Sequence, residues 1–175
     1  SELILDMAEK ARTAETILNT AETERDPVLV GKTLDSVAAQ IGSAYPDVEV
    51  SVAESPAETA RCLWLLEPIV ENLVENGAEH NTATDPWVRI AATADDESIT
   101  VTVTDNGPGI PKVEADVVRD GGETPPRHGQ GVGLWLVAWA VDRMGGSISF
   151  DRPQSGGTVA TVTVPRGDEG ASGES

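Results

Sequence analysis

The stretch ENLVENGAEHN, residues 71–81, places amide side chains at helical spacing. Asn72, Asn76 and His80 recur every four residues, so on a helix they share one face. Asparagine is a weak helix former, and two in mid-helix need a further reason. Oxygen ligation of Mg²⁺ is one such reason. The glutamates beside the asparagines are more simply explained as a solvated helix face: Glu71, Glu75 and Glu79.

A second polar segment, DNGPGI at residues 105–110, directly follows an expected strand. A carboxylate at the end of that strand, Asp105, can accept a hydrogen bond from an exocyclic amine, and the glycines allow a planar ring to come close. Asn-Gly and Gly-Pro pairs also mark ordinary turns. On this segment alone, an amine-reading site and a turn remain equal alternatives.

A third segment, HGQGVG at residues 128–133, opens an expected helix whose first N–H groups can receive a phosphate. It is not a Rossmann fingerprint, because Leu134 occupies the third glycine place and no strand leads into it. The chain also has no glycine-rich loop ending in Lys-Ser or Lys-Thr. Alone, this cluster is weak evidence, and a flexible hinge explains it as well.

Taken in order, these segments are more specific than any one of them. The chain resembles the ATP-binding catalytic domain of sensor histidine kinases, within the superfamily of gyrase, Hsp90, histidine kinase and MutL ATPases. Residues 71–81 resemble the N box, 105–109 the G1 box, 129–133 the G2 box and 156–158 the G3 region. The resemblance covers about residues 28–166, and residues 1–22 are similar to the second helix of a dimerisation domain.

This resemblance implies a role for each matching residue. Asn76 would coordinate a Mg²⁺ ion that bridges the phosphates of ATP, assisted by Asn72, and Asp105 would bind the adenine amino group. A lid would be formed by residues 111–128, and Thr158 would support the adenine end. The full set of implied nucleotide contacts is Asn72, Asn76, His80, Asp105, Gly107, Gly109, Ile110, Arg127, Gly129, Gly131, Val132, Gly133, Leu134 and Thr158.

Some positions depart from the family pattern. Glu79 stands where many members carry Lys, and His80 replaces a frequent aromatic residue that covers adenine. The lid lacks the usual phenylalanine, since Phe150 is the only one in the chain and belongs to a later strand. We expect lid closure to depend instead on Val117, Val118 and Arg119 or Arg127.

The residues favour phosphoryl transfer over hydrolysis. In gyrase-like and Hsp90-like relatives a Glu base precedes the magnesium asparagine by four residues, and here Asn72 occupies that place. A neutral amide cannot abstract a proton from water, and Glu71 lies about 100° around the helix. An imidazole acceptor is itself the nucleophile and needs no such base.

The acceptor must come from elsewhere, because His80 and His128, the two histidines, both lie in the expected nucleotide site. We therefore expect a two-component kinase whose acceptor histidine lies on a dimerisation domain, upstream or in trans, with a response-regulator receiver as later recipient. The parent would be a homodimer, and its association with a membrane stays open. Two alternatives stay open: a degenerate, non-catalytic nucleotide-binding module, and a serine kinase of the anti-sigma type.

The elements that must position these residues alternate between helices and antiparallel strand pairs. Hydrophobic spacing predicts helices at residues 2–23, 28–44, 68–80 and 132–144 and strands at 48–52, 87–94, 98–104, 147–151 and 158–164. A long loop spans residues 106–131. This order predicts an α+β fold, a two-layer sandwich with a mixed sheet of about five strands and helices on one face, which is the Bergerat fold that the resemblance implies.

Composition sets the outer limits. The 175 residues and one cysteine suit one domain, at most with an appendage. With the resemblance, we expect the end of a dimerisation-domain helix at 1–23, the ATPase domain at 24–166 and a disordered acidic tail at 167–175. A net charge of -18 disfavours contact with nucleic acid or an anionic membrane. Without a membrane-spanning run or signal peptide, we expect a cytoplasmic fragment. Spread over the chain, the acidic residues suggest a halophile.

Overall fold

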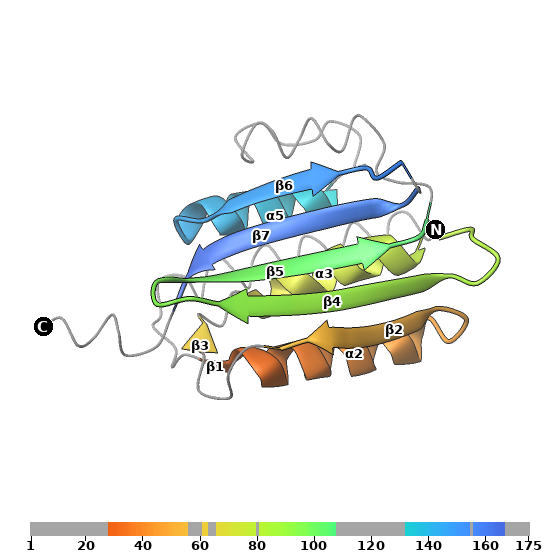
Figure 1. Cartoon of the computed structure of the whole chain (residues 1–175), viewed down its shortest axis with the longest axis horizontal. Helices are drawn as coiled ribbons and strands as arrows, with labels where there is room; N and C mark the ends of the chain where they lie inside the picture. Colours follow the sequence, from red (N-terminus) through yellow and green to blue (C-terminus); the bar gives the residue numbers. More distant parts are fainter. Residues whose placement is uncertain are drawn as a thin grey trace, which may run out of the picture.

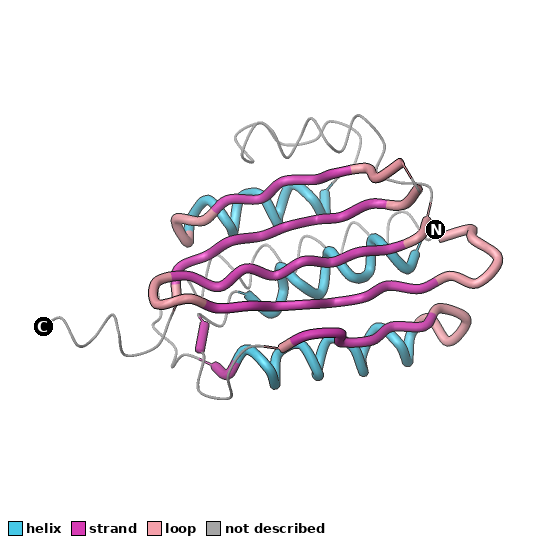
Figure 2. Tube along the Cα trace, viewed as in Figure 1, coloured by secondary structure: helices cyan, strands magenta, loops and turns pink. Residues whose placement is uncertain are grey.

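A five-stranded sheet carries helices on one of its faces (Figures 1 and 2). This computed structural model describes residues 28–55, 61–62, 66–79, 81–107, 132–154 and 156–166. The sheet has the order β2-β4-β5-β7-β6, with β2 Glu49–Glu54, β4 Trp87–Ala94, β5 Ser98–Asp105, β6 Ser147–Asp151 and β7 Thr158–Pro165. The helices behind it are α2 Val30–Ala44, α3 Leu66–Glu79 and α5 Val132–Arg143.

The alternation of side chains explains why one face is covered. Along β5, Ile99, Val101 and Val103 are buried, and threonines occupy the positions between them. Because successive residues of a strand point to opposite faces, the valines meet the helices and the threonines form the other face. On α2, Val30, Leu34 and Val37 recur at helical spacing and are fully buried against this layer.

Pairing is antiparallel from β4 to β6, whereas β2 runs parallel to β4. The α+β fold with a mixed sheet of about five strands, predicted from the sequence, is therefore confirmed. Strands β4, β6 and β7 begin where the hydrophobic pattern predicts, and α3 begins at Leu66, two residues before the expected start. Within the described ranges, no helix has the length and apolar character needed to cross a lipid bilayer.

The start of the helix predicted at 28–44 is wrong by two residues. Val28–Leu29 form the short strand β1, which pairs with β3, Arg61–Cys62. This pairing joins residues more than thirty positions apart, so local periodicity carries no signal for it. The expected helix at 2–23, the loop from residue 108 to 131 and the tail at 167–175 lie outside the described residues.

The turn between α5 and β6 packs tightly onto the neighbouring strand. Gly145 adopts a positive φ of 79°, and the N–H of Gly146 donates to the carbonyl of Val141 at 2.9 Å, which ends the helix as the Gly-Gly pair predicts. A methyl group on Gly146 would overlap the carbonyl oxygen of Thr163 on β7. No side chain fits there without moving the strand.

We predict opposite effects for two glycine-to-alanine substitutions. Gly146→Ala should lower the free energy of unfolding by about 1–3 kcal/mol, because backbone must shift to make room. Gly42→Ala should raise it by about 0.5–1 kcal/mol, since an added methyl on this helical residue lies 3.9 Å from Val50, an ordinary contact. Urea unfolding of both variants measures this, and equal changes would contradict the packing described at Gly146.

Candidate functional site

The carboxylate of Asp105 lies where α3, β5 and β7 meet. Asp105 is the last residue of β5, and its strand partner is Thr158, the first residue of β7. The N–H of Gly107 donates to Asp105 Oδ1 at 2.8 Å, and the backbone N–H of Thr158 also donates to the carboxylate. On the helix side, a methyl group on Gly77 would lie 3.1 Å from Asp105 Oδ2, so α3 approaches this carboxylate closely.

The backbone before Thr158 also depends on a glycine. Gly157 has a φ of 83°, a left-handed conformation that residues with a side chain rarely adopt. A methyl group there would overlap the carbonyl oxygen of Asp105. The start of β7 can therefore lie against the end of β5 only because residue 157 has no side chain.

The two asparagines of α3 differ in how their amides are satisfied. Asn72 is 7% exposed, and its Nδ2 donates to the carbonyl of Pro68 one turn earlier at 2.8 Å. Asn76 Nδ2 is buried and has no hydrogen-bond partner among the described residues. Asn76 immediately precedes Gly77, so its helical turn is the one that faces Asp105.

A second buried polar atom in this region also lacks a partner. Thr158 is 3% exposed, and its Oγ1 is buried with no hydrogen bond in the described part of the chain. Buried polar atoms are nearly always paired with protein, water or ligand. Two such atoms without a partner in the described part of the chain, one on the strand partner of Asp105 and one on the adjoining turn of α3, therefore indicate a place for a polar ligand. The Asp105 carboxylate can accept from an amine such as that of a purine, and the Asn76 Nδ2 can donate to an oxygen-rich group. The close packing at Gly77 and Gly157 brings the elements that carry these groups together.

Burial raises the pKa of the Asp105 carboxyl above its ordinary value of 3.8. The hydrogen bonds from Gly107 and Thr158 favour the ionised form and oppose this shift, but loss of hydration outweighs them. A carboxylate that is partly stripped of water and not fully compensated is ready to accept a hydrogen bond from a ligand amine.

Comparison with known proteins agrees with this geometry. Residues 64–168 match the family described as histidine kinase-, DNA gyrase B-, and HSP90-like ATPase. The chain belongs to this family. It is 30% identical over 162 residues to the sensor-type histidine kinase PrrB of Mycobacterium tuberculosis and 32% identical over 152 residues to the sensor protein CutS of Streptomyces coelicolor.

A solved structure supports the same assignment. The crystal structure of the ATP-binding domain of PrrB from M. tuberculosis superimposes with a TM-score of 0.64 at 29% identity, covering 81% of this chain and 97% of that one. The sequence matches cover 88% of this chain with PrrB and 81% with CutS, but only 35% and 36% of those proteins. The chain thus spans about a third of these relatives and is a histidine-kinase-type ATP-binding catalytic domain.

Within this ATPase domain, the structure brings together part of the set predicted from the sequence. Asp105, Gly107 and Thr158 lie together, with Asn76 on the adjoining turn of α3 and Asn72 one turn before it. Val132, Gly133 and Leu134 form the first turn of α5, of which the backbone alone is described. The remaining predicted residues lie outside the described ranges: His80, Gly109, Ile110, Arg127, Gly129 and Gly131.

The solvated face expected for the glutamates of α3 is wrong for two of them. Glu71 accepts a hydrogen bond from Gln40 of α2 at 2.8 Å, and Glu75 accepts one from the Tyr45 hydroxyl at 3.1 Å. Both glutamates are half-buried, and Glu79 is exposed as expected. Contacts over thirty or more residues carry no sequence signal, so the spacing alone could not separate these positions.

Sequence reasoning also missed the side chains that hold the turn after Asp105. Asn106 bonds to Asn81 and to the backbone at Asp85 and Trp87. These residues belong to the connection between α3 and β4, which the sequence marks only as polar and turn-rich. The Asn-Gly pair at 106–107 was read as a turn signal, and nothing in the pattern identified the partner of the asparagine.

The raised pKa of Asp105 predicts a pH-dependent stability difference from Asp105→Asn. Between pH 3.8 and the higher pKa of the folded state, the folded protein binds a proton that the unfolded chain has released. The wild-type protein should therefore lose stability relative to the variant as pH rises through this window.

Urea unfolding of both proteins across acidic to neutral pH checks this, with Asp35→Asn, an exposed change on α2, as the control. A constant difference between wild type and Asp105→Asn at all pH values would contradict the proposed burial cost.

Proposed function

We propose that this domain transfers the γ-phosphoryl group of ATP to a histidine of a dimerisation domain, as part of a two-component sensor histidine kinase. The observation that carries the proposal is the half-buried carboxylate of Asp105 against Gly77, whose neighbour Asn76 has a buried Nδ2 without a hydrogen-bond partner among the residues that the structure describes. A carboxylate that can accept from an exocyclic amine and an amide whose oxygen can ligate a metal suit the two ends of an adenine nucleotide. We call the region around Asp105, Thr158 and Asn76 the nucleotide ledge. A receiver domain and a second copy of the parent are the further partners that such a kinase requires.

Adenine recognition is proposed for Asp105. Its carboxylate would accept a hydrogen bond from the exocyclic amine. The Thr158 hydroxyl, which has no hydrogen-bond partner within the described ranges, offers a second polar contact at the same end. The N–H of Gly107 donates to the same carboxylate and so helps to orient it. Guanine presents a carbonyl where adenine presents the amine, so an ionised carboxylate at this place repels it.

Magnesium is proposed to bind through the side-chain oxygen of Asn76, with Asn72 behind it. Within the described ranges no group of three or more His, Cys, Asp or Glu could hold a metal, so most ligands would be phosphate oxygens and water, as Mg²⁺ prefers. Bound there, the ion would neutralise charge on the phosphates. The first turn of α5, preceded by Gly129 and Gly131, is the proposed phosphate cradle, because helix N–H groups bind anions.

The proposed reaction is transfer rather than hydrolysis. Asn72 occupies the place of a hydrolytic base and donates its Nδ2 to its own helix, and Glu71 bonds to Gln40. An acceptor imidazole nitrogen would form a bond to the γ-phosphorus as the bond to the β–γ bridging oxygen breaks and ADP leaves. We infer a cytoplasmic location for the domain, because ATP and receiver domains are found there.

We predict that Asp105→Asn and Asn76→Ala each weaken ATP binding, by about 10- to 100-fold for loss of a hydrogen bond to a charged group. Omitting Mg²⁺ should reduce the effect of Asn76→Ala but leave that of Asp105→Asn. Calorimetry measures both, with Asp35→Asn as a surface control. Wild-type protein that binds no ATP, or variants that bind normally, would favour a degenerate interaction module.

A longer chain that includes the segment upstream should become phosphorylated in ATP and Mg²⁺. Acid-labile phosphohistidine is the expected product, and acid-stable phosphoserine would instead favour the serine-kinase alternative.

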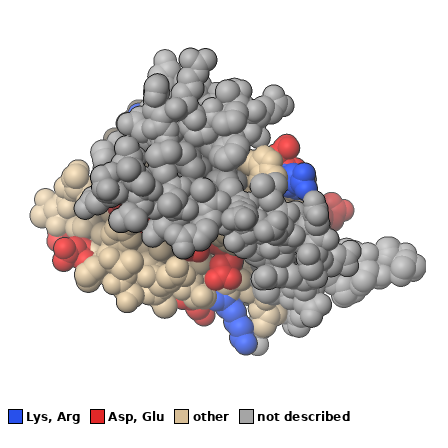
Figure 3. Space-filling view, turned by 180° about the vertical axis from the view of Figure 1, so that it is seen from behind, with Lys and Arg blue, Asp and Glu red and all other residues tan. Residues whose placement is uncertain are grey.

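We further propose that the domain works at high ionic strength. The chain carries 30 acidic and 12 basic residues, and acidic side chains occur at separate places on the visible helix side (Figure 3). At 1 M salt the Debye length falls to about 3 Å, which screens this repulsion.

The melting temperature should therefore rise by several degrees, roughly 5 °C, between low and molar KCl. A variant that neutralises Asp35, Asp47 and Asp96 should show a smaller rise, which separates charge screening from general salt effects. A melting temperature independent of KCl would refute the idea.

A further inference from the structure

The amide of Asn106 joins the end of β5 to the connection between α3 and β4. Its Oδ1 accepts hydrogen bonds from Asn81 Nδ2 and from the N–H of Trp87, both at 2.9 Å, and its Nδ2 donates to the carbonyl of Asp85 at 2.9 Å. Asn81 Oδ1 in turn accepts from the N–H of Ala83 at 3.0 Å. Three different parts of one loop are thus bound by a single side chain.

This network lies on the other side of the turn from the nucleotide ledge. Asp105 contacts α3 at Gly77, whereas Gly107 packs on Asn81, where an added methyl group would lie 3.2 Å from Cγ and 3.4 Å from Cα. Positions 77 and 81 are about one helical turn apart in sequence. Contact at one position would let the 105–107 turn pivot, and contact at both defines its orientation.

We propose that Asn106 is a positioning residue that, with Asn81, holds the 105–107 turn at the angle at which Asp105 reads adenine. This inference rests on the proposed function of Asp105, and it gives a specificity role to a residue whose own amide is bonded to the α3–β4 connection. That connection is also bonded to the edge strand β2, because the N–H of Glu49 donates to the carbonyl of Pro86 at 3.0 Å. The segment that holds Asn106 is therefore itself held by the sheet.

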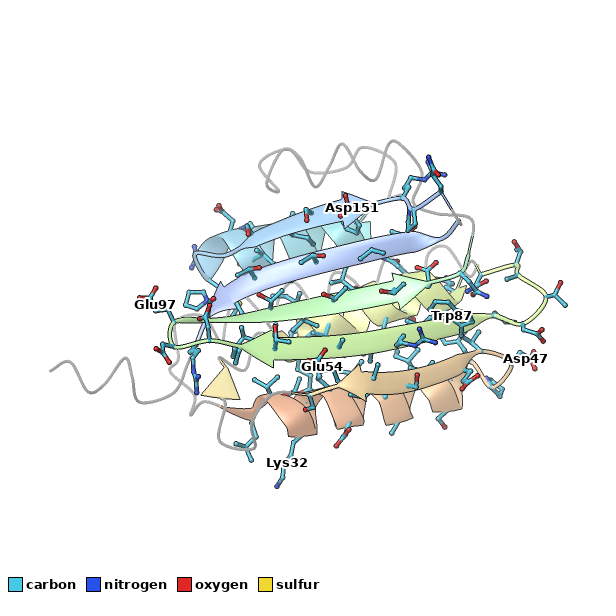
Figure 4. The ribbon with its side chains drawn as sticks, viewed as in Figure 1. Lys32, Asp47, Glu54, Trp87, Glu97 and Asp151 are labelled. Carbon is cyan, nitrogen blue, oxygen red and sulfur yellow. The ribbon has the colours of Figure 1, made fainter. Side chains whose placement is uncertain are left out.

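The β4–β5 hairpin supplies a matched control at its far end. Asp95 accepts hydrogen bonds from the N–H groups of Glu97 and Ser98 at 2.8 and 2.7 Å and from the Ser98 hydroxyl at 3.2 Å. Glu97 and Trp87 mark the two ends of this hairpin (Figure 4). Asn106→Ala removes three hydrogen bonds and Asp95→Ala removes four, since the Ser98 hydroxyl also lies 3.4 Å from the second carboxylate oxygen of Asp95. The first change lies near the site and the second at the far end of the same hairpin, so the control is at least as disruptive.

The first measurement needs no nucleotide. Hydrogen exchange at the Gly107 amide, followed by NMR, should become about tenfold faster in Asn106→Ala relative to amides in the middle of β5, because the turn loses its anchor. In Asp95→Ala, the exchange rate of the Gly107 amide should keep its wild-type ratio to the rates of the amides in the middle of β5. Equal behaviour of Gly107 in both variants would overturn the inference, whatever the domain binds.

The second measurement is base preference. The ratio of ATP to GTP affinity should fall about tenfold in Asn106→Ala and stay at the wild-type value in Asp95→Ala. Asn106→Asp, which keeps both acceptor contacts but loses the donor to Asp85, should fall between them.

An unchanged ratio in Asn106→Ala, in a protein where Asp105→Asn abolishes the preference, would refute the positioning role alone. Wild-type protein without adenine preference would refute the proposed function, and the exchange result would then decide the structural claim by itself.

Discussion

The structure of the site depends on one carboxylate that is kept partly out of water at the end of a strand. Asp105 can occupy this place only because the residues around it are small: Gly77 on α3 brings the helix against it, and Gly157 lets β7 pass behind it. Burial raises the pKa of the carboxyl, so the folded state bears a local cost. Under the proposed function, a ligand amine that bonds to the carboxylate would offset this cost, which is the kind of local conflict expected at a functional site.

The amides of α3 show how one residue type serves two purposes. Asn72 donates its Nδ2 to the carbonyl of Pro68 on its own helix, whereas the buried Nδ2 of Asn76 has no hydrogen-bond partner in the part of the chain that the structure describes. Two side chains from α2 and its C-terminal end hold α3. Gln40 of α2 bonds to Glu71, and Tyr45, which directly follows α2, bonds to Glu75. These hydrogen bonds join the two helices of one layer and thereby help to fix the position of α3 behind the sheet.

Local patterns in the sequence were sufficient for most of the fold and for the places of two polar residues. Alternating valines and threonines predicted β5, and the same patterns placed Asn76 on a helix and Asp105 at the end of a strand, where the structure has them. The roles of both residues stay predictions. What could not be predicted depends on contacts between distant residues. The β1–β3 pairing, the contacts of Glu71 and Glu75 with α2, and the bonds of Asn106 to Asn81 across 25 residues are examples. Such contacts form only once the sheet has fixed which segments are neighbours.

Electrostatics explains why recognition must be short-range in this domain. A chain of net charge -18 repels a nucleotide triphosphate at a distance, and Glu79 adds an exposed carboxylate at the end of α3. Hydrogen bonds that a half-buried carboxylate accepts and that backbone N–H groups donate act over about 3 Å, within the screening length even at 1 M salt. Partly dehydrated contacts keep their strength when salt screens the surface. An acidic domain can therefore bind an anion, provided that its selectivity resides in the orientation of a few groups such as Asp105.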